Sequence, residues 1–175
     1  MEARTAGSSV YGLARANTGL SWDVALQTPP PAFYPSFGPL PAVVGVQGQS
    51  KTWDRVGYTR TLLLSDGSTV VETITGSERG ASFGYDLSDF TKLFGRLVSG
   101  AHAEWTFVTE RSATLITWSY EFHALPGRGG LVSAIVSLFW ARYMRRVLPR
   151  IIAEIEAVNG RSSHVPAARH DPLAS

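Results

Sequence analysis

The segment TLITWSYEFH, residues 114–123, decides the fold of this 175-residue chain. Its side chains alternate, with Ile116, Trp118, Tyr120 and Phe122 on one face and polar side chains on the other. Successive side chains of a β-strand point to opposite faces, so this alternation is typical of an antiparallel strand with one buried side and one solvated side. The segment therefore predicts a strand whose aromatic face looks into a core.

The same period of two residues continues toward the N-terminus. Residues 102–110 predict the partner strand of a hairpin that turns near Arg111 and Ser112, and residues 81–87 predict another strand. Residues 58–64 and 69–75 flank Asp66-Gly67, which predicts a hairpin with a type I′ turn because such a turn needs positive φ at both central residues. Residues 20–26 and 47–53 are further strand candidates.

A helical pattern replaces the strand pattern after PGRGG, residues 126–130. Pro149 falls inside the helical segment and predicts a kink or break at residues 145–149. Asn159-Gly160 predicts the end of the helix. The residues with the spacing of an amphipathic helix are Leu131, Ile135, Leu138, Phe139, Arg142, Leu148, Ile151, Ile152 and Ile155.

These segments predict one α+β domain over residues 18–159, with flexible tails at residues 1–17 and 160–175. We expect a curved, seven-stranded antiparallel sheet wrapped around the long C-terminal helix. Because one helix is too narrow to cover seven strands, the arrangement leaves an apolar cavity between helix and sheet. The proline-rich stretch at residues 28–46 lies at the expected entrance, and the sequence leaves its geometry open.

The composition excludes several classes of protein. There is no cysteine, so disulfides and cysteine chemistry are impossible. The formal net charge of +2 is too small to indicate nucleic-acid binding. The N-terminus lacks the apolar core of a secretory signal, and no stretch reaches the ~18 apolar residues of a transmembrane helix. We therefore expect a cytoplasmic protein without integral membrane association, and the oligomeric state stays open.

Several short motifs resemble those of the SRPBCC, or START-like, superfamily of helix-grip proteins, within its polyketide cyclase/dehydrase-like branch. The resemblance covers roughly residues 40–157 and implies a hydrophobic pocket between sheet and helix. Members bind lipids, hormones or polyketides, and some catalyse cyclisation or dehydration. Relatives usually carry two regular short helices where this chain is proline-rich. The motifs are residues 56–61, 65–67, 71–72, 83–85, 103–107 and 114–118, and Tyr143-Met144-Arg145-Arg146 in the terminal helix.

Nine side chains are candidates for the cavity wall. Aromatic rings on the inner strand faces would stack on a flat ligand and tyrosine hydroxyls would orient it, although core packing is the alternative role. Arg142 falls in the apolar stripe of the helix by its spacing, so it either reaches to the edge or faces an anionic ligand group. The ligand-binding candidates are Tyr58, Phe83, Tyr85, Trp105, Trp118, Tyr120, Phe139, Arg142 and Tyr143.

Arg60 and Glu72 lie on the two arms of the Asp66-Gly67 hairpin. They form either a buried pair that polarises a ligand or moves a proton, or an ion pair on a solvated face. A two-residue loop places Arg60 opposite Thr73, whereas a one-residue bulge brings it opposite Glu72.

Two functions remain open. The first is the binding of a small hydrophobic, lipid- or polyketide-like ligand. The second is a cofactor-free cyclase or dehydratase, with Arg60, Glu72, Tyr85 and Tyr120 as catalytic candidates that orient an enolate or carbonyl. The two histidines inside the predicted fold, His102 and His123, point away from the core by their strand parity, so we expect no metal site and no cofactor.

Overall fold

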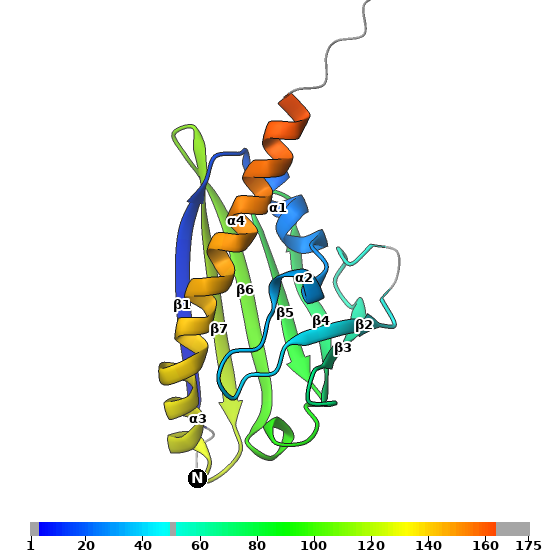
Figure 1. Ribbon diagram of the computed structural model, residues 1–175, viewed down its shortest axis with the longest axis vertical. Coiled ribbons are helices and arrows are strands. Elements are labelled where there is room, and N and C mark those ends of the chain that lie inside the picture. The colour runs from blue at the N-terminus through cyan, green and yellow to red at the C-terminus, as the bar shows by residue number, and fades with distance from the viewer. Residues whose placement is uncertain (1–3, 50–51, 164–175) are drawn as a thin grey trace, which may run out of the picture.

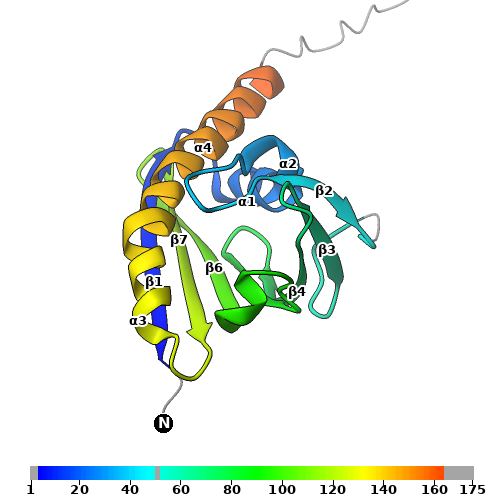
Figure 2. The same cartoon turned by 60° about the horizontal axis from the view of Figure 1, so that its bottom comes forward.

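A computed structural model describes residues 4–49 and 52–163 of the chain. Seven antiparallel strands form one sheet in the order β1-β7-β6-β5-β4-β3-β2 (Figure 1). Figure 2 shows that the sheet curves from β1 around to β2. The predicted α+β helix-grip fold is confirmed. The strands are β1 (Thr5–Ala14), β2 (Val43–Gln47), β3 (Thr59–Leu64), β4 (Thr69–Glu78), β5 (Ser82–Ser88), β6 (Val98–Glu110) and β7 (Ala113–Ala124).

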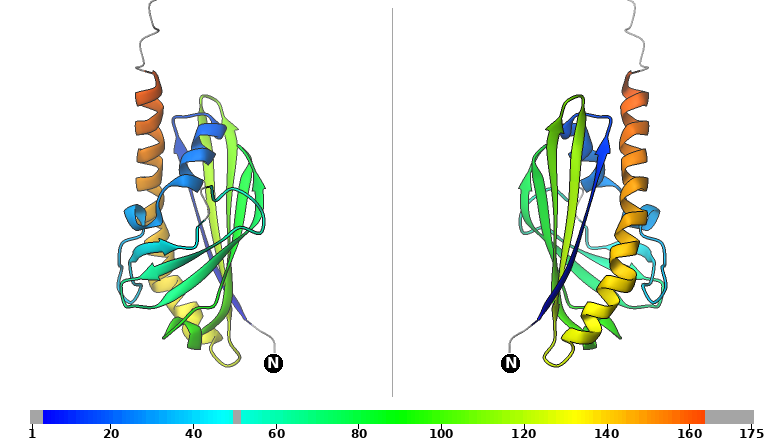
Figure 3. Two further views of the ribbon diagram at one scale, coloured as in Figure 1. Left: turned by 90° about the vertical axis from the view of Figure 1, so that its right-hand side faces the viewer. Right: turned by 90° about the vertical axis from the view of Figure 1, so that its left-hand side faces the viewer.

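The helices lie on the concave side of the sheet, as the side views show (Figure 3). The longest, α4 (Ala141–Ser163), packs against β1 and α1 and buries Met144, Val147, Ile151 and Ile155. It therefore closes one flank of the curved sheet. The others are α1 (Thr18–Gln27), α2 (Pro30–Phe33), the 3₁₀-helix η1 (Phe94–Arg96), α3 (Gly129–Ile135) and the π-helix η2 (Val136–Trp140).

The β6–β7 hairpin forms as the sequence predicts. Ile116, Trp118, Tyr120 and Phe122 are all buried, and Trp105 of β6 lies directly opposite Trp118. The two indole rings stack with their centroids 4.8 Å apart. This pair anchors the centre of the core.

The prediction of a flexible tail at residues 1–17 is wrong for residues 5–14. Residues 5–14 form β1, which pairs with β7 along its whole length and so occupies one edge of the sheet. Val10 and Ala14 point inward and are buried. The strand is hard to detect because its inward residues are small and its partner β7 lies about a hundred residues further along the chain.

Residues 20–26 form a helix, α1, rather than the predicted strand. The side chain of Asn17 accepts a hydrogen bond from the Leu20 backbone N–H (2.8 Å) and so caps the helix N-terminus. Trp22 and Leu26, four residues apart, turn toward the core, and the Trp22 indole N–H donates to the Ser82 carbonyl (2.9 Å). These tertiary contacts outweigh the short alternating pattern.

The predicted strand at residues 47–53 is displaced. The strand at this place, β2, covers Val43–Gln47, and residues 48, 49, 52 and 53 belong to no strand. Residues 50–51 lie outside the described part of the chain.

Two helix-breaking signals do not break the helix. α4 runs through Pro149, whose side chain is exposed, while Leu148 and Ile151 on either side are buried. The packing of these neighbours outweighs the one backbone hydrogen bond that proline removes. The helix also continues past Asn159-Gly160 to Ser163, and residues 164–175 of the expected tail lie outside the described residues.

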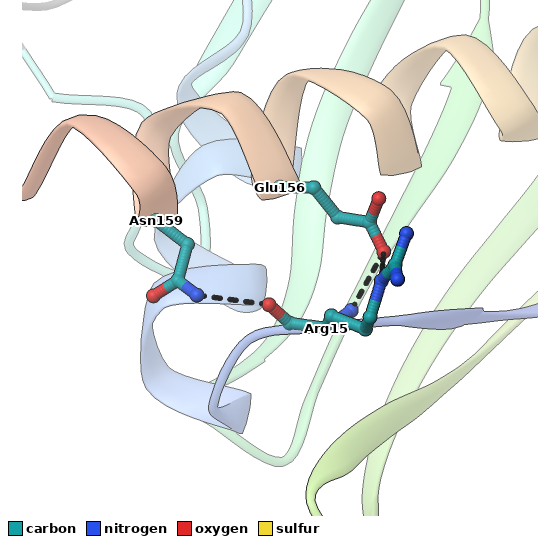
Figure 4. A network of polar contacts seen from close by, with 3 residues as sticks. All are labelled: Arg15, Glu156 and Asn159. Atoms are coloured by element: carbon teal, nitrogen blue, oxygen red, sulfur yellow. Dashed lines mark hydrogen bonds and ion pairs between the residues drawn. The ribbon is translucent and has the colours of Figure 1, made fainter. Parts of the chain in front are cut away.

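A small network of hydrogen bonds joins the end of β1 to α4 (Figure 4). The Arg15 backbone N–H donates to Glu156 Oε1 (2.9 Å), and Arg15 Nε lies 3.3 Å from the same oxygen. The Asn159 amide donates to the Arg15 carbonyl (2.9 Å). These contacts give Asn159 a role inside the helix instead of at its end.

The β3–β4 hairpin has a bulged register. Within the turn only Gly67 has positive φ, at +75°, so the expected type I′ turn is not formed. Gly67 N–H donates to Leu64 O and Leu64 N–H donates to Ser68 O (both 2.9 Å), which leaves a three-residue loop. As a result Arg60 lies directly opposite Glu72. The bulge alternative is therefore the correct one.

Candidate ligand-binding cavity

A cavity lies between the concave face of the sheet, the α2–β2 segment and the η2–α4 helix. It offers about 90 Å³ to the centre of a water-sized sphere. This exceeds the ~10–15 Å³ that one water needs, but it is below the ~300–1,000 Å³ of pockets for drug-sized ligands. Its wall consists of Tyr34, Leu40, Pro41, Val43, Leu62, Leu64, Val70, Glu72, Tyr85, Leu87, Phe90, Phe94, Trp118, Tyr120, Phe122, Trp140 and Tyr143.

The mouth of this main cavity is where its lining side chains reach the surface. Most sheet residues in the wall are buried, including Leu62, Val70 and Leu87. The side opposite the sheet is formed by Tyr34 and Leu40, which come from the proline-rich stretch. The partly exposed residues that mark the mouth are Tyr34, Pro41, Leu64, Phe90, Phe94 and Trp140.

Arg60 and Glu72 form a buried ion pair at one end of the main cavity. The Arg60 Nε to Glu72 Oε2 distance is 2.6 Å, and the two residues are only 7% and 4% exposed. The Arg60 guanidinium also lies over the Trp53 ring, 3.5 Å from its centroid. Glu72 itself is part of the cavity wall. The alternative of an ion pair on a solvated face is therefore wrong.

Four tyrosines bring hydroxyl groups to the wall. Burial raises the pKa of Tyr34, Tyr85, Tyr120 and Tyr143 above the ordinary tyrosine value. The negative charge of Glu72 raises the pKa of Tyr85 further, and the Tyr85 hydroxyl does the same for Tyr34. These side chains therefore stay neutral near pH 7 and can donate hydrogen bonds.

Two indole groups in the wall carry unused donors. The Nε1 atoms of Trp118 and Trp140 are buried, and neither has a hydrogen-bond partner in the described part of the protein. A buried donor without a partner is costly. An oxygen atom of a ligand would satisfy such a donor.

Comparison with known proteins agrees with this arrangement. The family model described as "Polyketide cyclase / dehydrase and lipid transport" matches residues 21–156. The chain belongs to this family. A comparison with curated protein sequences gives no significant match.

Two solved structures share the fold of this polyketide cyclase/dehydrase family member. The Zhui aromatase/cyclase from Streptomyces sp. R1128 is 13% identical with a TM-score of 0.67, covering 94% of this chain and 100% of its own. Ara h 8.0201 is also 13% identical, with a TM-score of 0.56 and coverage of 88% of this chain and 99% of its own. At this identity the likeness concerns the fold.

The structure brings together part of the predicted site. Tyr85, Trp118, Tyr120 and Tyr143 line the main cavity together with Glu72. Phe83 and Trp105 lie beside Arg60 at a smaller cavity of about 10 Å³, which shares Tyr34 and Tyr85 with the main one.

Three predicted residues line neither the main cavity nor the small cavity beside Arg60. Tyr58 precedes β3 and is only partly buried. Phe139 lies against Gly38, where an added Cβ would come within 2.7 Å of its ring. Arg142 is exposed. The π-helical turn at Val136–Trp140 adds a residue to one turn, so the inward positions of the following helix fall on Tyr143 and Met144.

Sequence reasoning missed Tyr34, Leu40, Phe90, Phe94 and Trp140. Tyr34 stands in the proline-rich stretch, whose geometry the sequence leaves open. Trp140 follows Val136 by four residues, which is the one local signal that it faces inward.

The histidines lie outside the site, as their parity indicated. His102 Nδ1 is 2.7 Å from Asp86 Oδ1, and His123 Nε2 is 3.4 Å from Glu121 Oε1, all on partly or fully exposed side chains. Among residues 4–49 and 52–163, no three histidine or carboxylate side chains are grouped to hold a metal. No helix of this part of the chain is long and apolar enough to cross a membrane.

Proposed function

We propose that the protein binds a small, flat, hydrophobic ligand in the main cavity, with the polar atoms of the ligand toward Glu72 and the tyrosine hydroxyls. The observation that carries the proposal is the composition of the wall, which is aromatic and aliphatic apart from one carboxylate and a few neutral donors. Pockets for small molecules have this character, because apolar groups supply affinity and a few polar groups set the orientation.

The unused indole donors support a ligand that carries oxygen. Trp118 is fully buried, and its Nε1 has no partner within the described residues. A phenolic or carbonyl oxygen would satisfy this group and accept from Tyr85 or Tyr120 as well. A pure hydrocarbon would leave these donors unpaired.

Titration calorimetry with 1-naphthol tests the proposal. Leu87→Trp fills the cavity from β5 and is expected to lower the affinity at least about tenfold, because it removes the space that the ring needs. Leu131→Trp is the matched control, since the same change is made at a residue 51% exposed on α3. Equal binding by all three proteins would contradict the proposal.

Native mass spectrometry of protein purified from its own host adds an independent check. A co-purified small molecule in the wild type that is absent from Leu87→Trp would place that molecule in the cavity. A molecule retained by both proteins would lie elsewhere.

Cofactor-free cyclisation or dehydration is the second candidate function, favoured by the presence of Glu72 in the wall. A carboxylate can remove a proton next to a carbonyl, and the hydroxyls of Tyr85 and Tyr120 can donate to the enolate oxygen that forms. Arg60 holds Glu72 Oε2 in place.

Glu72→Gln separates this candidate from simple binding. The amide keeps the shape of the side chain but cannot act as a base, so turnover of a poly-β-carbonyl thioester should fall by about 10²–10⁴. Binding of 1-naphthol should change much less. If the wild type leaves the thioester unchanged over the spontaneous reaction, the protein is a binding protein and not an enzyme for this class.

A further inference from the structure

A second small cavity, distinct from the one beside Arg60, adjoins the main cavity. It measures about 10 Å³ on the same scale, and the two share Leu40, Phe94, Phe122 and Trp140 as a common wall. The remaining wall of the second cavity is wholly aliphatic and comes from Leu97, which follows η1, from the start of β6 and from α3 and η2. It consists of Leu97, Val98, Val132, Ile135 and Val136.

The two cavities differ in chemistry. The main cavity contains a carboxylate and hydroxyl groups, whereas the second contains only hydrocarbon side chains and one indole. An aliphatic chain is the chemical group that such a wall accepts, because it buries apolar surface without leaving a polar group unpaired.

Trp140 is the residue of the common wall that is best placed to move. Its ring packs on Tyr120, Phe122 and Tyr143 with centroid distances of 4.6, 5.2 and 5.4 Å. Its Nε1 makes no hydrogen bond in the described part of the chain, so rotation of the side chain breaks none. It is also only partly buried, as is Phe94, whereas Leu40 and Phe122 are buried; unlike Phe94, it stands at the irregular end of a π-helical turn.

The backbone at Trp140 is irregular as well. Trp140 ends the π-helical segment η2, in which the Ala141 N–H donates to the Val136 carbonyl five residues back. π-Helical turns inside α-helices are rare and frequent at functional sites. Here the turn places Val136 in the second cavity and Trp140 in the shared wall.

We propose that Trp140 is a movable partition, and that its displacement joins the two cavities so that the protein accepts a ligand with a polar aromatic head and an alkyl tail. The inference rests on the proposed binding function and deepens it. The head occupies the main cavity near Glu72, and the tail passes Trp140 into the aliphatic cavity. Trp140 thereby determines the length of ligand that the protein accepts.

Binding of 4-alkylphenols with tails from methyl to octyl tests the proposal. Each methylene buried adds roughly fourfold to affinity. Trp140→Ala removes the partition, so the ratio of octyl to methyl affinity should rise at least about tenfold over the wild type. Ile135→Phe fills the aliphatic cavity, so the same ratio should fall at least about tenfold while 4-methylphenol binding stays within about twofold.

The control is Leu138→Ala, because Leu138 lies in the same π-helical segment but is 50% exposed. Leu138→Ala should keep the wild-type ratio of octyl to methyl affinity. Unchanged ratios in both Trp140→Ala and Ile135→Phe would overturn the proposal. Loss of 4-methylphenol binding by every protein, the wild type included, would count against the proposed function instead.

Crystals of the wild type and of Trp140→Ala under xenon pressure decide the partition role without any organic ligand, because xenon enters dry apolar cavities. Xenon is expected in the aliphatic cavity of Trp140→Ala, continuous with the main cavity. Two separate cavities in that variant would overturn the proposal even if phenols fail to bind.

Discussion

Two of the arginine–glutamate pairs differ almost completely in environment. The pair Arg60–Glu72 is buried beside the cavity, at 2.6 Å. The pair Arg15–Glu156 joins β1 to α4 at 3.3 Å, with side chains 86% and 30% exposed. Water screens the second pair and competes with it, whereas the charges of the first pair are balanced inside the protein by the pair itself, by the Gln49 side-chain oxygen that accepts from Arg60 Nη1 (3.3 Å) and by the Trp53 ring. Identical residue types therefore lie beside the candidate cavity in one place and join β1 to α4 in the other.

Breaking the buried pair should have the largest effect. Glu72→Leu leaves Arg60 charged and unpaired in the interior, so the free energy of unfolding should fall by about 3–5 kcal/mol. Urea unfolding followed by circular dichroism measures this loss.

The double variant Arg60→Met with Glu72→Leu is the control. It removes both charges and should recover most of the lost stability, because a buried ion pair is often no better than hydrophobic residues of similar volume. It should still bind 1-naphthol more weakly than the wild type. A double variant as unstable as Glu72→Leu would mean that the pair itself, and not the orphaned charge, stabilises the fold.

High pH should act on the tyrosines around the buried pair. Burial raises the pKa of Tyr34, Tyr85, Tyr120 and Tyr143 in the folded protein, so the unfolded state releases its tyrosine protons first. Stability is then fully present below the unfolded value of about 10 and falls above it, by up to about 1.4 kcal/mol per pH unit for each tyrosine. Urea unfolding between pH 9 and 11.5 measures the slope.

Tyr85→Phe should reduce that slope, because it removes one of the four groups and also one cause of the raised Tyr34 pKa. Tyr11→Phe, at a residue 78% exposed, is the matched control for the loss of a hydroxyl. An unchanged slope in Tyr85→Phe would show that Tyr85 is accessible to hydroxide in the folded state.

The exposed pair should give the smallest effect. Glu156→Gln should lower the free energy of unfolding by less than about 1 kcal/mol at pH 7 and low salt, and by less still in 1 M NaCl. The Arg15 backbone N–H lowers the pKa of Glu156 in the folded state. The contribution is therefore present above the unfolded value near 4.3 and is lost as the pH falls through the folded value.

Thermal unfolding of wild type and Glu156→Gln from pH 7 to pH 2.5 measures this difference. The two melting curves should converge at the acid end. A gap that persists there would mean that Glu156 acts through packing against β1 and not through its charge.

The buried pair also shows how much of the candidate site could be predicted from the sequence. Its two residues were candidates from the hairpin alone, but their register depended on whether the loop was bulged, and local residues allow both forms. The β6–β7 hairpin was predictable because large rings alternate with polar side chains. β1 has no such contrast, since its outward Tyr11 and Leu13 are larger than its inward neighbours.

Residues on the helical side of the cavity were harder to predict, for a different reason. At Gly12 an added Cβ would lie 2.5 Å from Ile152 Cδ1, so the glycine lets α4 approach β1 closely. Such a contact depends on two elements at opposite ends of the chain. The π-helical turn likewise changes which side chains of the helix face inward, so Trp140 lies in the cavity wall and Arg142 does not. A sequence pattern interpreted with a uniform helical period does not reveal this change.

The position of β1 at the sheet edge has a consequence for synthesis. β1 precedes the other six described strands in the chain and pairs with β7, the last of them, with Thr5 opposite His123. At ~5–20 residues per second, its partner is translated roughly 5–25 s later. The strand contains neither a charge nor a proline, the residues that commonly keep strand edges apart. We expect neighbouring nascent chains on one messenger to compete for β1 during those seconds, so the yield of folded protein depends on ribosome spacing as well as on the stability of the finished fold.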